Sequence, residues 1–346
     1  MKGCDILFHP NRIIFEKGTR DYEIGQSIYN TFSTNPKIEI VETAANKIKP
    51  LITMDTAAET YQQGKKTLVV SKKRSGAFQT CKPSADYMLP LVSGCMGQCE
   101  YCYLHTQLGD KPFVRVNVNL DDIFAKATKY MLERPEQITS FEGSATSDPV
   151  CVEPYTHALE QAILFFAKEP LGRFRFVTKY SDVDTLLSLE HNNKTEIRFS
   201  INTKRIRDQY EHFTADIDSR IKAAAKVMKA GYPVGFLIAP VFLYDGWEDE
   251  YQQLILHLQE TLPANYPHQL FFEVITHRFT PKAKDLIQSI FPDSSLPMEE
   301  DLRQYKYGQF GYGKYVYKKE DMHSVKAFFQ SHLMSAFPNC EIKYIV

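Results

Sequence analysis

Between Tyr87 and Ile275, short apolar runs alternate with stretches of helical spacing, and this alternation constrains the fold more than any other feature. The apolar runs span Tyr87–Val92, Gln137–Glu142, Phe174–Thr178, Glu196–Ile201, Val234–Ala239 and Leu270–Ile275. The helical stretches span Leu120–Glu133, Pro154–Glu169, Ser181–Glu190, Ala215–Ala230 and Trp247–Thr261. Near-continuous apolar β runs are typical of parallel strands covered by helices. Six such units predict an α/β fold with one parallel sheet, which could be open or curled.

The segments on either side of this repeat predict two additions. Before residue 86, we expect strands at Arg12–Phe15, Ile38–Val41 and Thr67–Val70, and helical segments within Asp21–Phe32 and Lys49–Gly64. After residue 280, we expect a hairpin within Tyr305–Tyr317 around Gly311, a helix at Lys319–Leu333 and a strand at Glu341–Val346. The predicted domains are therefore an N-terminal α/β addition (1–85), a central sheet (86–280) and a C-terminal hairpin and helix (281–346).

The overall charge offers no general attraction to nucleic acid, because the formal net charge of the 346 residues is −1. Any binding of nucleic acid must then come from a local basic face. Two candidate clusters are Lys65, Lys66, Lys72, Lys73, Arg74 and Lys82, and Arg303, Lys306, Lys314, Lys318 and Lys319. A run of charges is more often a solvated face than a binding site. No apolar run is long enough for a membrane helix, and the N-terminus lacks the hydrophobic region of a signal peptide.

Three of the seven cysteines, Cys95, Cys99 and Cys102, fall on one loop with the spacing Cys-x3-Cys-x2-Cys. Three thiolates on one loop can hold a [4Fe–4S] cluster and leave one iron open for chemistry. The alternative is a closed Cys3His zinc site completed by His105. The other cysteines are scattered, without the framework expected for disulfides, which favours a reducing cytoplasm.

The sequence around these cysteines resembles that of the spore photoproduct lyases, which belong to the radical S-adenosylmethionine (SAM) superfamily. The segments that carry the resemblance are GCMGQCEYCYL and, after it, KPFVRVNVNLDDI. This resemblance spans nearly the whole chain. It implies a partial (β/α)6 barrel with Cys95, Cys99 and Cys102 as ligands of a [4Fe–4S] cluster beside bound SAM. It also implies a lyase that repairs the spore photoproduct, a methylene-bridged thymine dimer in UV-damaged DNA, to two thymines.

The resemblance assigns further roles residue by residue. Ser147, Lys179 and Ser200 follow or end predicted strands and inherit the SAM-binding role, and ligands of such sheets bind at the carboxyl ends of strands. Tyr101 and Tyr103 flank Cys102 and inherit a relay that returns a radical to SAM. Taken alone, such a serine could equally be a cap or loop residue.

One position departs from the family pattern. The lyases carry a hydrogen-donating cysteine in the loop after the second strand, where this chain has Ala145 in FEGSATSD. Cys81 or Cys151 could supply the thiol instead, and we prefer Cys81, which precedes the first strand beside the basic Lys82. The alternatives are that either cysteine is only a small buried residue, or that Ala145 marks an altered enzyme.

The resemblance implies two partners, namely DNA carrying the lesion and a reductant of flavodoxin or ferredoxin type. We expect a bacterial spore or germinating cell, and a cytoplasmic protein. An aromatic hairpin can stack on bases once the lesion is turned out of the duplex, and the candidate DNA-binding residues are Lys82, Tyr305, Tyr307 and Lys314. The rival functions are a radical SAM enzyme acting on another substrate and a non-catalytic Cys3His zinc or Fe–S protein that binds nucleic acid.

Overall fold

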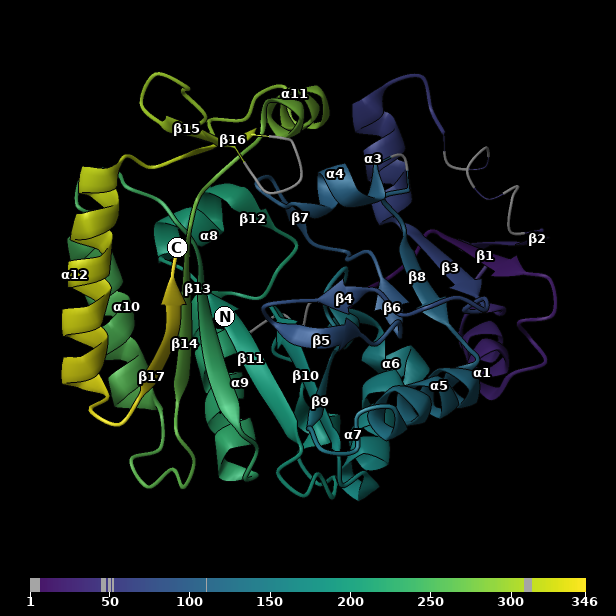
Figure 1. Ribbon diagram of the computed structural model, residues 1–346. Coiled ribbons are helices and arrows are strands. Elements are labelled where there is room, and N and C mark those ends of the chain that lie inside the picture. The colour runs from purple at the N-terminus through teal and green to yellow at the C-terminus, as the bar shows by residue number, and fades with distance from the viewer. Residues whose placement is uncertain (1–6, 45–47, 49–50, 52, 110, 308–312) are drawn as a thin grey trace.

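The computed structural model describes residues 7–44, 48, 51, 53–109, 111–307 and 313–346. Its larger sheet has the strand order β17-β14-β13-β11-β10-β9-β5-β4 (Figure 1). The six inner strands are parallel and confirm the six predicted runs. They are β5 (Ala85–Met88), β9 (Thr139–Glu142), β10 (Gly172–Thr178), β11 (Thr195–Ile201), β13 (Val234–Val241) and β14 (Phe271–Thr276).

The sheet curls into a partial barrel, as the family resemblance implied. Arg175 on β10 and Glu273 on β14 are three strand spacings apart, roughly 14 Å along a flat sheet. Their side chains nevertheless meet at 3.0 Å inside the curl. Arg198 on β11 also bonds Glu142 on β9 there, so that the floor of the barrel is an ionic layer. The other face of the sheet is covered by α7 (Ala158–Lys168), α9 (Ile217–Lys229), α10 (Trp247–Thr261) and α12 (Lys319–Ala336).

A second sheet carries the N-terminal addition and has the order β2-β1-β3-β8-β6. Its strands β1 (Arg12–Glu16), β2 (Glu39–Thr43) and β3 (Thr67–Ser71) match the predicted runs. Its other strands, β6 (Val92–Ser93) and β8 (Val114–Asn117), come from beyond residue 85. The cysteine loop therefore leaves this sheet at β6 and returns to it at β8. The helices of the N-terminal addition are α1 (Glu23–Phe32) and α3 (Ala57–Lys65).

The C-terminal segment forms the predicted hairpin, helix and strand. Strands β15 (Gln304–Tyr307) and β16 (Gly313–Val316) are antiparallel, while Gly311 lies outside the described residues. The hairpin is tied to the barrel by backbone bonds between Phe279 and Tyr315. Strand β17 (Glu341–Ile345) lies parallel to β14 and extends the barrel sheet. None of the described helices is long and apolar enough to cross a membrane.

Two predicted helices differ from the structure. Ser181–Glu190 is not an α-helix and contains only the 3-10 turn η3 (Asp184–Leu186). The buried Tyr232 hydroxyl donates to the Leu186 carbonyl, so this carbonyl is satisfied without a further helical turn. Pro154–Glu169 divides into α6 (Glu153–Thr156) and α7, because His157 between them adopts a left-handed conformation with φ of 49°. Further α-helices are α4 (Leu104–Leu108), α5 (Leu120–Leu132), α8 (Lys204–Tyr210) and α11 (Pro281–Ile290).

Candidate active site

A cavity of about 1380 Å³ opens at the carboxyl ends of the barrel strands, beside the cysteine loop. Most of the predicted site residues line it, although they come from five separate segments of the chain. These residues are Cys81, Lys82, Cys95, Cys99, Tyr101, Cys102, Tyr103, Ser147, Lys179 and Ser200. The hairpin residues Tyr305, Tyr307 and Lys314 do not line it. The fold thus brings the predicted thiols, hydroxyls and lysines to one place.

Two contacts fix the ends of the cysteine loop. At its start, Gly94 has φ of 77°, and a Cβ there would lie 2.1 Å from the carbonyl oxygen of Phe113. Only glycine fits this turn. The Gly94 N–H donates to the carbonyl of Thr146 at 2.7 Å, which joins the loop to the segment after β9. Further along, β7 (Gln98–Cys99) pairs antiparallel with β12 (Glu211–His212), a short strand that follows α8.

The three thiols of the loop do not form a single-ion site in this structure. Among the described residues, no three His, Cys, Asp or Glu side chains converge as one metal ion requires. The ring of His105 lies with Nε2 2.9 Å from the carbonyl of Cys99, and burial lowers the pKa of His105 to about 4. The Cys3His zinc alternative therefore lacks its geometry here.

Burial also raises the pKa of Cys99 and of Cys102 above that of an ordinary thiol. Without a cationic centre, these sulfurs therefore keep their protons. Bound iron would supply the charge that makes them thiolates. The thiols thus fit a [4Fe–4S] cluster chemically.

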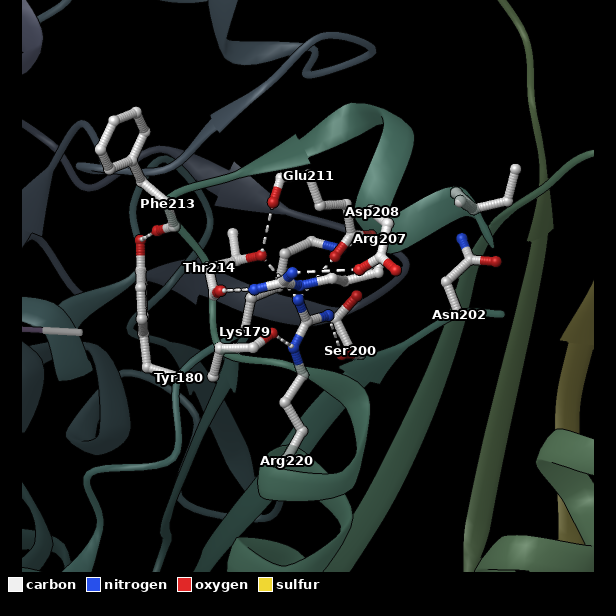
Figure 2. A network of polar contacts seen from close by, with 12 residues as sticks. Lys179, Tyr180, Ser200, Asn202, Arg207, Asp208, Glu211, Phe213, Thr214 and Arg220 are labelled. Atoms are coloured by element: carbon white, nitrogen blue, oxygen red, sulfur yellow. Dashed lines mark hydrogen bonds and ion pairs between the residues drawn. The ribbon is translucent and has the colours of Figure 1, made fainter. Parts of the chain in front are cut away.

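Lys179 follows β10 directly. Its Nζ lies 2.7 Å from Oε1 of Glu211, and both residues are labelled in Figure 2. The same Nζ lies 3.1 Å from the hydroxyl of Tyr101, which also donates to Glu211. On the other side of Glu211, Arg220 donates to Oε2 at 2.6 Å. Burial favours the neutral acid, but Arg220 and Lys179 outweigh it and lower the pKa of Glu211 to about 2.

The sequence did not reveal Glu211 and Arg220 as functional residues. Both side chains have no exposed surface, and Arg220 also donates to the carbonyl of Ser200 at 2.9 Å. Glu211 lies on β12, against the cysteine loop, so this network connects the predicted SAM residues Lys179 and Ser200 to that loop. Arg220 lies within a helical pattern, where a charged residue is normally expected on the exposed face, so its burial could not be predicted from the sequence.

Asp148 is a second residue that the sequence did not single out. Its Oδ2 accepts a bond from the backbone N–H of Lys179 at 2.7 Å, but its buried Oδ1 has no hydrogen-bond partner among the described residues. Burial raises the pKa of Asp148 to about 8. Asp148 lines the cavity beside Ser147. An unpaired buried acceptor at this place fits a ligand with an ammonium group, such as the amino group of SAM.

Cys81 lies on β4 (Thr80–Cys81), which pairs antiparallel with β5, and it is partly buried at the cavity wall. The turn after it is held by Ser84, whose hydroxyl donates to Glu142 at 2.9 Å and whose carbonyl accepts from Arg175 at 2.7 Å. Burial and the nearby Glu142 raise the pKa of Cys81 to about 11. Burial and a nearby carboxylate therefore dominate the environment of this thiol.

Cys151 is buried outside the cavity lining. Its Sγ donates to the carbonyl of Asp148 at 3.0 Å. Its thiol also lies beside that of Cys95 and lowers the pKa of Cys95, and both cysteines are free. Tyr103 instead extends into the cavity, where its hydroxyl donates to the carbonyl of Ala145 at 2.6 Å. Of the two candidate thiols, Cys81 is the one at the cavity.

Each of the two predicted basic clusters contains a side chain that is buried and therefore does not contribute to a basic surface. Lys72, Lys73, Arg74 and Lys82 line the cavity and form a basic rim. Lys65 does not belong to this rim, because its side chain is buried against the cysteine loop. Arg303 is buried as well, and donates to the carbonyl of His277.

The family model for spore photoproduct lyase matches residues 8–346. A spore photoproduct lyase of Clostridium acetobutylicum is 49% identical over 335 residues, which cover 97% of this chain and 98% of the relative. The spore photoproduct lyase of Bacillus subtilis is 42% identical over 337 residues, with coverage of 97% and 98%.

Solved structures agree with this similarity. A spore photoproduct lyase complexed with dinucleoside spore photoproduct matches with a TM-score of 0.93 and 42% identity, over 98% of this chain and 99% of that chain. A mutant lyase with one Cys replaced by Ala and one Ser replaced by Cys matches with a TM-score of 0.93 and 43% identity, over 98% and 99%. That mutant holds bound AdoMet and the dinucleoside lesion. The similarity covers the barrel and both additions.

Proposed function

Because this chain belongs to the spore photoproduct lyase family, we propose that it splits the spore photoproduct in DNA into two thymines, with Cys81 as the hydrogen donor. The observation that carries the choice of Cys81 is its place at the cavity wall with a raised pKa. A thiol can give up a hydrogen atom, whereas a thiolate has none to give. A buried environment that keeps Cys81 protonated therefore suits this reaction.

Cys95, Cys99 and Cys102 would hold the [4Fe–4S] cluster, and Ser147, Lys179 and Ser200 would bind SAM. When bound, the cluster supplies the electron that cleaves SAM and so provides the 5′-deoxyadenosyl radical, which is chemistry of the cofactors. The unpaired Oδ1 of Asp148 would receive the SAM amino group. The chain's own tasks are to orient these groups and to keep water from the cavity.

In the lesion, loss of a hydrogen atom from C6 of the dihydrothymine half breaks the methylene bridge and leaves an allylic radical on the other thymine. Cys81 would then transfer the hydrogen atom of its S–H bond to that radical, giving thymine and a sulfur radical. The turn held by Ser84 and Arg175 fixes the position of this thiol. Ala145 has no transferable hydrogen on a heteroatom, so it cannot perform this step.

Tyr103, which lines the same cavity, would return a hydrogen atom to the Cys81 radical. The tyrosyl radical would in turn regain a hydrogen atom from 5′-deoxyadenosine, so that the adenosyl radical, and with it SAM, would be restored. We expect Tyr103→Phe to cleave SAM normally but to form several-fold fewer thymines per SAM consumed. The measurement is the ratio of thymine to 5′-deoxyadenosine in an anaerobic assay. Tyr29→Phe, on α1 and outside the cavity lining, is the matched control, and an unchanged ratio in Tyr103→Phe would exclude the relay. Tyr101→Phe tests the relay less directly, because loss of the Tyr101 hydroxyl also removes its hydrogen bonds with Glu211 and Lys179.

DNA would lie over the basic rim of Lys72, Lys73, Arg74 and Lys82, which surrounds part of the cavity. The hairpin offers exposed aromatics for stacking on bases, since Tyr307 is 84% exposed and Tyr305 is 42% exposed. Lys314 on the opposite hairpin strand would contact phosphate. A flavodoxin- or ferredoxin-type reductant in the cytoplasm would supply the electron.

The function is tested by incubating the reconstituted protein anaerobically with a lesion-bearing oligonucleotide, SAM and dithionite. We expect thymine to form and lesion DNA to stimulate SAM cleavage, whereas undamaged DNA should not. SAM cleavage that ignores the lesion would indicate another substrate. Stoichiometric zinc with no SAM cleavage would indicate the non-catalytic alternative.

A further inference from the structure

Lys65, the last residue of α3, is a buried cation that the proposed reaction does not use. Its side chain is about 5% exposed. Its ammonium group donates to the carbonyl of Cys95 at 2.6 Å and to the carbonyl of Gly97 at 2.8 Å. Both acceptors lie on the cysteine loop, so a residue of the N-terminal addition holds the loop between the first and second cluster ligands.

The packing of α3 explains how Lys65 reaches the loop. Gly64 lies so close to Pro112 that a Cβ there would be 2.4 Å from Cγ of the proline. The ring of Tyr61, one turn earlier on the same helix, lies 5.1 Å from Lys65 Nζ. Gln62 also donates to the side chain of Gln98 at 2.9 Å. The end of α3 is thus fitted against the loop at several points.

The positive charge of Lys65 has no carboxylate partner among the described residues, and its two hydrogen-bond acceptors are neutral carbonyls. The acidic groups on which its charge acts are the thiols of the loop, since Lys65 favours the thiolate forms of Cys95 and Cys102. A buried charge without a counter-charge is costly. A [4Fe–4S] cluster with three thiolate ligands is anionic, and becomes more so when reduced. Such a cluster would supply the missing negative charge beside Lys65.

We propose that Lys65 is a positioning residue for the cluster: it locks the cysteine loop through Cys95 and Gly97, and its positive charge favours the reduced cluster. This proposal rests on the proposed function, because it requires a cluster on Cys95, Cys99 and Cys102. Charge and hydrogen bonds around a cluster are among the features that set its reduction potential. A fixed cation makes the added electron more favourable and therefore raises the potential.

The test compares Lys65→Met, Lys65→Gln and Lys65→Arg with the wild type after anaerobic reconstitution, without DNA. Iron and sulfide content are measured first, and the midpoint potential is then measured by a redox titration followed by EPR. We expect Lys65→Met to retain less iron than the wild type, because the hydrogen bonds to the carbonyls of Cys95 and Gly97 are lost. Lys65→Gln should keep one of these hydrogen bonds and the cluster, but shift the midpoint potential of the cluster to a more negative value. Arg, which restores the charge, should return the potential toward that of the wild type.

Lys66→Met is the matched control, because its side chain is exposed and the same charge is removed one residue away. It should leave iron content and potential unchanged. Thermal unfolding of each variant separates loss of the loop bonds from general unfolding. A Lys65→Gln potential equal to that of the wild type would overturn the role of the charge, and full iron content in Lys65→Met would overturn the lock. Lesion repair by the wild type is measured separately, so that a failure of the proposed lyase activity can be distinguished from a failure of the proposed role of Lys65.

Discussion

Replacing Cys81 with Ala should abolish clean formation of thymine while SAM cleavage continues. The thiol is the only cavity-lining cysteine of the described residues outside the cluster triad, so its loss leaves the thymine radical without a donor. We expect a fall in thymine yield of roughly 100-fold or more, in the range seen when a positioned hydrogen-transferring group is removed. Adducts or stalled products should replace thymine, and they can be separated and quantified by chromatography.

Two further variants make this result decisive. Cys340→Ala removes a buried thiol that contacts the carbonyl of Leu333 in the C-terminal segment, and it should repair the lesion normally. Adding Ala145→Cys to Cys81→Ala should restore part of the thymine yield, because position 145 also lines the cavity. Clean repair by Cys81→Ala would show that the donor lies elsewhere.

Replacing Glu211 with Gln should destabilise the fold and weaken SAM binding together. The substitution leaves the partly buried ammonium of Lys179 and the fully buried guanidinium of Arg220 without their shared carboxylate. Removal of one partner from a buried ion pair typically costs about 3–5 kcal/mol. Thermal or denaturant unfolding measures the loss, and equilibrium binding measures the affinity for SAM. Glu248→Gln, at an exposed position in the first turn of α10, should change stability by less than about 0.5 kcal/mol.

The pH dependence gives a second check on Glu211. Its pKa is lowered from 4.5 to about 2, so its stabilising contribution is complete above the ordinary pKa and is lost as the pH falls toward 2. The stability difference between wild type and Glu211→Gln should therefore be large at pH 7 and shrink on acidification below about 4.5. A difference that does not change with pH would contradict the assigned ionisation of Glu211.

The sequence predicted the parts of the site that depend on local order. The cysteines Cys95, Cys99 and Cys102 had to lie on one loop because they are close in sequence. Ser147, Lys179 and Ser200 follow or end parallel strands, and the carboxyl ends of such strands lie at one edge of the sheet. The six runs are short and rich in apolar, β-branched and aromatic residues, and all six became strands of one sheet.

The tertiary structure alone decided which charges are partnered, and by what. Glu211 meets Lys179 from another strand, Glu142 sets the environment of Cys81, and Lys65 turns from an expected basic surface to the cysteine loop. Local hydrophobic periodicity reports which face of an element is buried, but carries no information about a partner on another segment. The energy of a charged group depends on such distant neighbours and on its exposure to water, and the fold sets both.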